Sequence, residues 1–163
     1  MNGDPKLYTL LEELHIPFDY IEHPPVPTIE AARHYWAGHD AQHCKNLFFR
    51  NHKGNKHYLV ILDCDCDMDI HAIEKMLKQG KLSFASEQRM QKYLNVQPGS
   101  VTPFGLMNDT DRHVYLFLDK NLQQATRLSF HPCINTASLI ITREDFMRFL
   151  AYTGHPYEWI EVY

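Results

Sequence analysis

Three short segments of the sequence carry residues that are difficult to explain by packing alone. They are Lys45-Asn46, Gly99-Ser-Val-Thr-Pro-Phe-Gly105 and His131-Pro-Cys-Ile-Asn-Thr136. A lysine offers a compact positive charge to a phosphate or a carbonyl oxygen. A glycine exposes backbone N–H and C=O groups that can bind a developing oxyanion. Each segment also has an ordinary interpretation: a strand lysine, a turn, and a structural histidine.

The common catalytic signatures are absent from the sequence. It contains no nucleophile elbow, phosphate-binding glycine loop, H-E-x-x-H or paired zinc-ligand motif. His131 precedes a proline, which biases its backbone towards an extended conformation and favours a ring that projects from a loop. Asn135 and Thr136 are suited to anchoring that loop by side-chain-to-backbone hydrogen bonds. Any chemistry is therefore expected from the three segments above.

An acidic run from Asp63 to Asp69 is a further candidate site. Its four carboxylates occur at every second residue, so an extended chain would point them to one side and a metal ion could bind there. Asp69 is also a good N-cap for a helix carrying Ile70, Ile73 and Leu77, with Gly80 at its end. We favour the capping interpretation and expect neither a metal nor another cofactor.

The cysteines are expected to be free thiols. The sequence contains Cys44, Cys64, Cys66 and Cys133. The middle two form C-x-C, whereas zinc and redox sites favour C-x-x-C. No leader or membrane-spanning run is recognisable, so we expect a cytoplasmic protein.

Positive charge is concentrated in one part of a chain whose net charge is -4. Residues 31–57 contain five basic residues against one acid, Asp40, which gives +4. The basic residues are Arg33, Lys45, Arg50, Lys53 and Lys56. This segment is a candidate surface for phosphates, and its ordinary interpretation is a solvated hairpin. The overall charge argues against a protein that coats nucleic acid.

The elements that must position these segments follow from local signals. Leucines at 7, 10, 11 and 14 predict a first helix, and a short strand is expected from Phe18 to Glu22. Thr28 is a plausible N-cap for a helix through Ala31 and Ala32. Two apolar runs, Asn46 to Arg50 and His57 to Asp63, predict a hairpin with its turn at residues 52–55.

Further elements are predicted in the second half of the chain. Ser86 is expected to cap a helix that Asn95 closes, and residues 99–111 are expected to form a loop before a strand at 113–118. A strand at 138–142 precedes a helix for which Thr142 and Asp145 resemble a capping box, and Gly154 stops it. With 163 residues, 44% of them apolar, we predict one domain over residues 1–163, with a mixed α/β, largely antiparallel sheet covered by helices.

Taken together, these motifs resemble the YbaK and prolyl-tRNA-synthetase-associated editing domain family. The resemblance covers essentially the whole chain. It consists of the Thr28 helix start, the Lys45-Asn46-Leu-Phe-Phe49 strand, G-x-x-x-P from Gly99 to Pro103, and His131-Pro-Cys-Ile-Asn-Thr136. The wording of the glycine segment is similar to that of the free-standing alanyl-tRNA(Pro) deacylases more than to the cysteinyl branch.

The resemblance implies roles for particular residues. Lys45 is implied to be essential, Gly99 belongs to a loop that lines the aminoacyl pocket, and His131 helps to set the size of that pocket. The residues expected at the substrate are Thr28, Asn46, Ser100, Val101, Thr102, Pro103, Asn135 and Thr136. The residues expected at the tRNA are Arg33, Arg50, Lys53 and Lys56.

The resemblance implies a metal-independent hydrolase that removes alanine from mischarged tRNA(Pro). Prolyl-tRNA synthetase is a possible further partner. We expect binding to neither a membrane nor DNA. Three alternatives stay open at this point. The amino acid could be cysteine, serine or another; the chain could be a non-catalytic tRNA-binding or synthetase-binding module; and the histidines with the acidic run could bind a metal.

Overall fold

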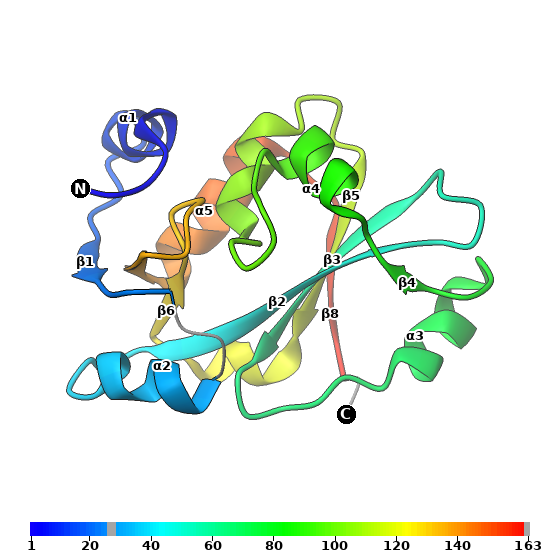
Figure 1. The fold of residues 1–163 in the computed structure, drawn as a ribbon, viewed down its shortest axis with the longest axis horizontal. Coiled ribbons are helices and arrows are strands. Elements are labelled where there is room, and N and C mark those ends of the chain that lie inside the picture. The colour runs from blue at the N-terminus through cyan, green and yellow to red at the C-terminus, as the bar shows by residue number, and fades with distance from the viewer. Residues whose placement is uncertain (26–28, 162–163) are drawn as a thin grey trace.

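A computed structural model describes residues 1–25 and 29–161 of the chain. Its centre is one mixed sheet whose strands follow the order β1-β7-β6-β2-β3-β5-β8, with β4 paired to β2 at one end (Figure 1). The strands are β1 (Asp19–Glu22), β2 (Gln42–Arg50), β3 (His57–Asp63), β4 (Ser83–Phe84), β5 (Val114–Asp119), β6 (Arg127–Phe130), β7 (Ala137–Thr142) and β8 (Tyr157–Ile160). Four of the pairings are antiparallel and three are parallel. The predicted mixed α/β class is confirmed.

Helices cover both faces of this sheet. They are α1 (Pro5–Glu13), α2 (Ile29–Trp36), α3 (Ile70–Leu77), α4 (Glu87–Leu94) and α5 (Arg143–Thr153), with the 3-10 helices η1 (Pro103–Asn108) and η2 (Lys120–Gln124). Figure 1 shows α4 and α5 on one side of the β2–β3 hairpin and α2 and α3 on the other.

Local capping residues set several of the helix starts. Asp69 accepts hydrogen bonds from the backbone N–H groups of His71 and Ala72. Ser86 and Thr142 do the same for Arg89 and Asp145 at the starts of α4 and α5. Each such cap stabilises its helix by about 1 kcal/mol. These three predicted caps are confirmed, whereas Thr28 lies outside the described residues.

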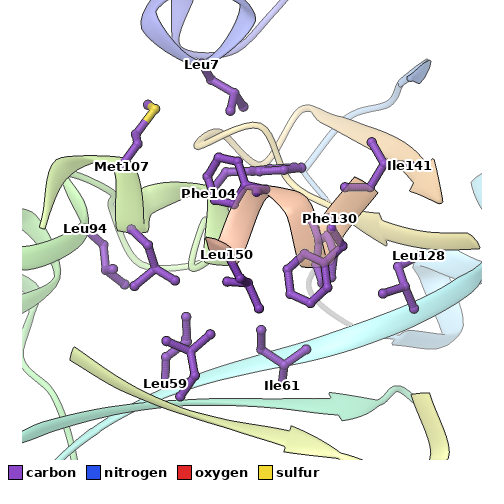
Figure 2. Close-up of a cluster of buried hydrophobic side chains, with 14 of the residues drawn as sticks. Leu7, Leu59, Ile61, Leu94, Phe104, Met107, Leu128, Phe130, Ile141 and Leu150 are labelled. Carbon is purple, nitrogen blue, oxygen red and sulfur yellow. The ribbon is translucent and has the colours of Figure 1, made fainter. Parts of the chain in front are cut away.

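Alternating side chains of the central strands build two apolar layers. Leu59 and Ile61 face the larger cluster, which includes Leu94 of α4 and Leu150 of α5 (Figure 2). The next residues along β3, such as Val60, face a smaller cluster with Ile73 of α3. Because both faces of β2 and β3 are buried, the hairpin strands read as apolar runs.

Some local predictions were wrong. Helix α3 ends at Leu77, and its C-cap is Lys78 in the left-handed conformation, two residues before the expected Gly80. The expected loop at 99–111 contains η1, which starts because Thr102 caps it and Pro103 supplies a preset φ angle. Strands β6 and β8 were not anticipated, because their apolar runs are too short to stand out from a loop.

None of the helices within residues 1–25 and 29–161 is long and apolar enough to cross a membrane.

Candidate active site

The candidate site begins where two parallel strands separate. The residue pairs that join β2 to β6 are Gln42 with Leu128 and His43 with Ser129. Beyond them β2 continues alongside β3, whereas β6 ends at Phe130 and the chain turns into the loop leading to β7. We call this point of separation the fork. Gaps between diverging strand ends are a common place for ligand sites in α/β sheets.

Lys45 lies at the fork, on the face of the sheet that carries α2. It follows His43 by two residues, so its side chain points to the same face. The His43 ring stacks on Trp36 of α2, with ring centroids 4.0 Å apart. The Lys45 side chain is 24% exposed, and its Nζ donates to the backbone oxygen of Cys66 at 2.7 Å and to Asp67 at 3.1 Å. The ammonium group is therefore held at two points while remaining accessible.

The acidic run folds into a loop that reaches Lys45 and α2. The chain turns at Cys64 and Asp65, so the four carboxylates do not line one side as an extended chain would require. The Asp63 carboxylate accepts from the backbone N–H of Asp65, and Asp65 forms an ion pair with Arg33. The loop thus links the lysine strand to the helix that covers the same face.

A metal site in this loop is not favoured by these contacts. Ligand atoms of Asp63, Cys64 and Asp65 lie within 4.8 Å of one another. However, the Asp63 and Asp65 carboxylates have protein partners, and burial and the neighbouring carboxylates of Asp65 and Asp63 raise the pKa of the Cys64 thiol. A protonated thiol is a poor metal ligand. Asp69 serves as the N-cap of α3, as the capping interpretation predicted.

Two of the three predicted loop segments meet. Gly99 has φ +86°, a left-handed conformation that favours glycine, and a Cβ atom added to it would lie 3.5 Å from Nδ2 of Asn135. The glycine segment and the His131–Thr136 segment are therefore in contact, although they are more than 30 residues apart in the sequence.

The remainder of the glycine segment is held by the protein interior. Ser100 and Thr102 are buried, and Val101 is half-buried against the larger apolar cluster. The Thr102 hydroxyl accepts from the backbone N–H of Phe104, and Pro103 opens η1. The side chains of Thr102 and Pro103 thus fix the loop, and its backbone groups near Gly99 are the ones that a ligand can approach.

Asn46, the neighbour of Lys45 on β2, carries an unpartnered polar atom. Its side-chain oxygen is buried, and no donor among the described residues reaches it. A buried oxygen without a hydrogen bond costs about 1–3 kcal/mol. Such atoms in native proteins often await a ligand or a water molecule, which agrees with the predicted place of Asn46 at the substrate.

His131 is anchored by one ring nitrogen. Nδ1 lies 2.8 Å from the backbone oxygen of Ala137, and no hydrogen-bond partner meets Nε2 within the part of the chain that the structure describes. Burial lowers the pKa of His131; the bond to Ala137 opposes this, and the nearby His23 lowers the pKa further. The ring is therefore neutral at pH 7.

His23 is a residue of this region that the sequence interpretation missed. It follows β1 and is 5% exposed, and its ring centroid lies 5.9 Å from that of His131 and 5.8 Å from that of Tyr35 in α2. The signal that could have found it is a histidine directly before Pro24, the same His-Pro pair that singled out His131.

The four predicted tRNA-binding residues are not brought together. Arg33 lies on α2, on the face of Lys45. Arg50 ends β2, five residues beyond Lys45, which corresponds to roughly 17 Å along a strand. Lys53 and Lys56 are exposed in the turn of the hairpin, which Figure 1 places at the opposite end from α2. Only Arg33 is close to the candidate site.

A cavity of about 550 Å³ lies away from the fork, near the hairpin turn. His57, Tyr58, Tyr115 and Phe117 contribute to its lining. Apart from Lys56, none of the predicted site residues lines it. Its position therefore does not change the assignment of the site to the fork.

The chemistry that the fork can support is attack by water rather than by a cysteine. Burial raises the pKa of Cys133, within the His131–Thr136 segment, to about 12, so its thiol stays protonated at neutral pH. Cys44, which follows His43 on β2, is likewise raised well above its ordinary pKa by burial. What the site offers is a cation, backbone dipoles and a neutral imidazole.

Comparison with known proteins identifies the family of the chain. The model of the family described as "aminoacyl-tRNA editing domain" matches residues 23–149. The prolyl-tRNA editing protein ProX of Acetoanaerobium sticklandii is 37% identical over 162 residues, with 99% of each chain covered. Prolyl-tRNA synthetase associated domain-containing protein 1 of Mus musculus is 34% identical over 149 residues, covering 89% of this chain and 88% of that protein.

A solved structure shares the fold. A crystal structure described as that of a candidate trans-editing enzyme for prolyl tRNA synthetase superposes with a TM-score of 0.70 at 20% identity, covering 99% of this chain and 98% of that one. The chain belongs to the aminoacyl-tRNA editing domain family and is an aminoacyl-tRNA deacylase.

Proposed function

We propose that this protein hydrolyses the ester bond of mischarged tRNA(Pro), with alanine as the amino acid it removes. The observations that carry the proposal are the contact between the Gly99 and His131–Thr136 segments and the partly exposed ammonium group of Lys45 at the fork. The similarity to a prolyl-tRNA editing protein supports the choice of tRNA. The Gly-Ser-Val-Thr-Pro-Phe-Gly wording of residues 99–105 supports the choice of alanine.

Lys45 positions the substrate in the proposed reaction. Its fully exposed partner Asp67 can be exchanged for the terminal phosphate or the ester carbonyl, while the Cys66 carbonyl keeps the ammonium group in place. Holding the ester in one geometry removes much of the entropic cost of attack. The Lys45 charge also opposes the negative charge that develops on the carbonyl oxygen.

Water completes the reaction. Its oxygen attacks the carbonyl carbon and loses a proton, backbone N–H groups near Gly99 stabilise the oxyanion, and the bond between the carbonyl carbon and the ribose oxygen breaks. The ribose oxygen leaves with a proton, which gives the free amino acid and intact tRNA. An aminoacyl ester is already activated, so the reaction needs no protein nucleophile. The neighbouring ribose hydroxyl of the substrate helps to activate the water.

Selectivity arises from exclusion. A synthetase pocket built for proline discriminates against a smaller amino acid by only about 1–3 kcal/mol per missing methylene. An editing pocket too small for proline removes the error afterwards, because proline is rejected by steric clash. We assign one wall of that pocket to the buried ring of His131.

Prolyl-tRNA synthetase is the proposed partner for tRNA selection. The names of several relatives refer to that synthetase, and this chain has a net charge of -4 with its cations divided between two places. Charged tRNA is made and used in the cytoplasm, which is where we place the protein.

The test is release of labelled amino acid from alanyl-, cysteinyl- and prolyl-tRNA(Pro) in chelator-treated buffer, with wild type beside Lys45→Ala. We expect alanine to be released fastest, proline to be spared, and Lys45→Ala to lose at least about 100-fold in rate. Faster release of cysteine would show that cysteine, not alanine, is the preferred substrate. If none of the three aminoacyl-tRNAs is cleaved, the proposed function is refuted.

A further inference from the structure

His23 holds the backbone segment that orients His131. The backbone N–H of His23 donates to the Thr136 oxygen at 3.0 Å, and its ring Nε2 lies 2.9 Å from the Ser138 hydroxyl. Between these two contacts lies Ala137, whose carbonyl oxygen holds Nδ1 of His131. His23 is thus hydrogen-bonded to Thr136 and Ser138, the residues on either side of Ala137, which in turn binds His131.

The contacts also define how the hydrogens are arranged on both rings. A carbonyl oxygen only accepts hydrogen bonds, so the nitrogen that faces it must carry the hydrogen. Nδ1 of His23 faces the Pro24 oxygen at 2.9 Å, and Nδ1 of His131 faces the Ala137 oxygen. In the neutral form of each ring Nε2 is then an acceptor. Nε2 of His23 accepts a hydrogen bond from the Ser138 hydroxyl. Nε2 of His131 has a lone pair that no donor among residues 1–25 and 29–161 engages, and it can accept a hydrogen bond from a ligand.

His23 is packed closely enough that a substitution there is expected to shift the residues around Ala137. His23 and Ser138 are 5% and 3% exposed, and the centroid of the His23 ring lies 5.9 Å from that of His131 and 5.8 Å from that of Tyr35 in α2. Strand register reinforces the arrangement, because Glu22 pairs with Ala137 and Ile21 with Ser138. A smaller or differently bonded side chain at position 23 would remove the ring contact to the Ser138 hydroxyl, next to Ala137, and would leave the backbone bond to Thr136 in place.

We propose that His23 is a positioning residue of the editing site, which acts through Ser138 and the Ala137 carbonyl to hold His131 as the wall that excludes proline. His23 touches no reacting atom in this role. The inference rests on the proposed function of His131, and it adds a residue outside the motifs that carry the family resemblance.

The test compares two buried histidines that differ in location. His23→Gln keeps a polar atom near Ser138 but loses the ring, and His155→Gln is the matched control. His155 is 4% exposed and bonds to Asp109 at 2.9 Å, between α5 and β8. The readout is the ratio of alanine release to proline release. Loss of folded protein lowers both rates equally, so a purely structural effect cancels from the ratio.

We expect His23→Gln to lower the alanine-to-proline ratio about tenfold, since one methylene of space in a pocket changes discrimination by about tenfold or more. His155→Gln should keep the wild-type ratio. Ser138→Ala removes only the hydroxyl and should lower the ratio in the same direction, which keeps the test open if His23→Gln does not fold. Wild-type ratios in both His23→Gln and Ser138→Ala would overturn the inference.

A spectroscopic measurement separates this inference from the proposed function. With 15N-labelled histidine, His131 of the wild type should give the NMR signals of the Nδ1–H form, and His23→Gln should give a mixture of tautomers. If alanyl-tRNA(Pro) is not cleaved at all, the proposed function fails while these spectra still decide the role of His23. Identical His131 signals in both proteins would refute that role.

Discussion

Lys45 of β2 and His131, the first residue after β6, each lie two residues beyond the last pair that joins these parallel strands, His43 and Ser129. The register that aligns β2 with β6 therefore places both residues at the fork. The proximity of the two residues to the fork follows from the pairing of β2 with β6, not from the residues next to them in the sequence. Three predictions test the surroundings of this pair, and a fourth tests the stability of the fold.

The left-handed backbone at Gly99 predicts a selective loss of hydrolysis. Gly99→Ala should destabilise the protein by about 1–2 kcal/mol, because φ +86° is strained for an alanine, and should lower deacylation at least tenfold by moving the loop backbone. Gly38 provides a matched control, since its φ is +84° and an added Cβ would meet nothing within 4 Å. Gly38→Ala should cost similar stability, measured by urea unfolding. A similar loss of activity in both variants would contradict the prediction.

The separation of the basic residues predicts that they differ in their effect on tRNA binding. Arg33→Ala should raise KM for aminoacyl-tRNA and reduce the salt dependence of binding by about one phosphate contact. A Lys53→Ala, Lys56→Ala double variant should leave KM within about twofold, because these lysines lie at the distant turn of the hairpin and long-range attraction is screened within about 10 Å at 0.1 M salt. Titrations at several salt concentrations decide between the two. A larger effect from the hairpin variant would place the acceptor stem there.

The lowered pKa of His131 predicts where activity declines in acid. The ring is neutral above a pKa that burial and the nearby His23 hold below the ordinary value near 6.5. If the neutral ring is needed, kcat should be constant from about pH 8 to 6.5 after subtraction of uncatalysed hydrolysis, and should fall only at lower pH. His131→Asn should abolish this acid limb. A midpoint at or above pH 6.5 in the wild type would be inconsistent with a neutral buried ring.

Asp109 predicts a pH-dependent part of the stability. Burial alone would raise its pKa, but hydrogen bonds from His155 and from the backbone of Val114 and His113 lower it below the usual value. The unfolded chain therefore binds a proton more readily, so this stabilisation is complete above about pH 4 and is lost as the pH falls towards the folded pKa. Asp109→Asn should cost about 1.5–3 kcal/mol at pH 7 and less at pH 3.

Urea unfolding at both pH values measures the effect of Asp109→Asn. Asp67→Asn is the control, because the Asp67 carboxylate is fully exposed and its replacement should change the free energy of unfolding by less than about 0.5 kcal/mol. A loss of stability for Asp109→Asn that does not depend on pH would show that the carboxylate charge is unimportant.

Local signals in the sequence determined much of the secondary structure. The caps at Asp69, Ser86 and Thr142 and the hairpin of β2 and β3 were predicted and are confirmed. Such features depend on hydrogen bonds and apolar contacts within a few residues, so neighbouring residues are enough to specify them. Recognition of the three loop segments likewise required only residue types at fixed spacing. The prediction of one domain stays a prediction.

The tertiary structure decided which of these residues share a site. It paired β2 with β6, brought Gly99 to Asn135, folded the acidic run onto Lys45, and placed His23 behind His131. It also separated Arg33 from the hairpin lysines. Strand order and loop contacts join residues that are 20 to more than 100 positions apart, and the packing of the whole core fixes them. A local pattern therefore cannot reveal such contacts.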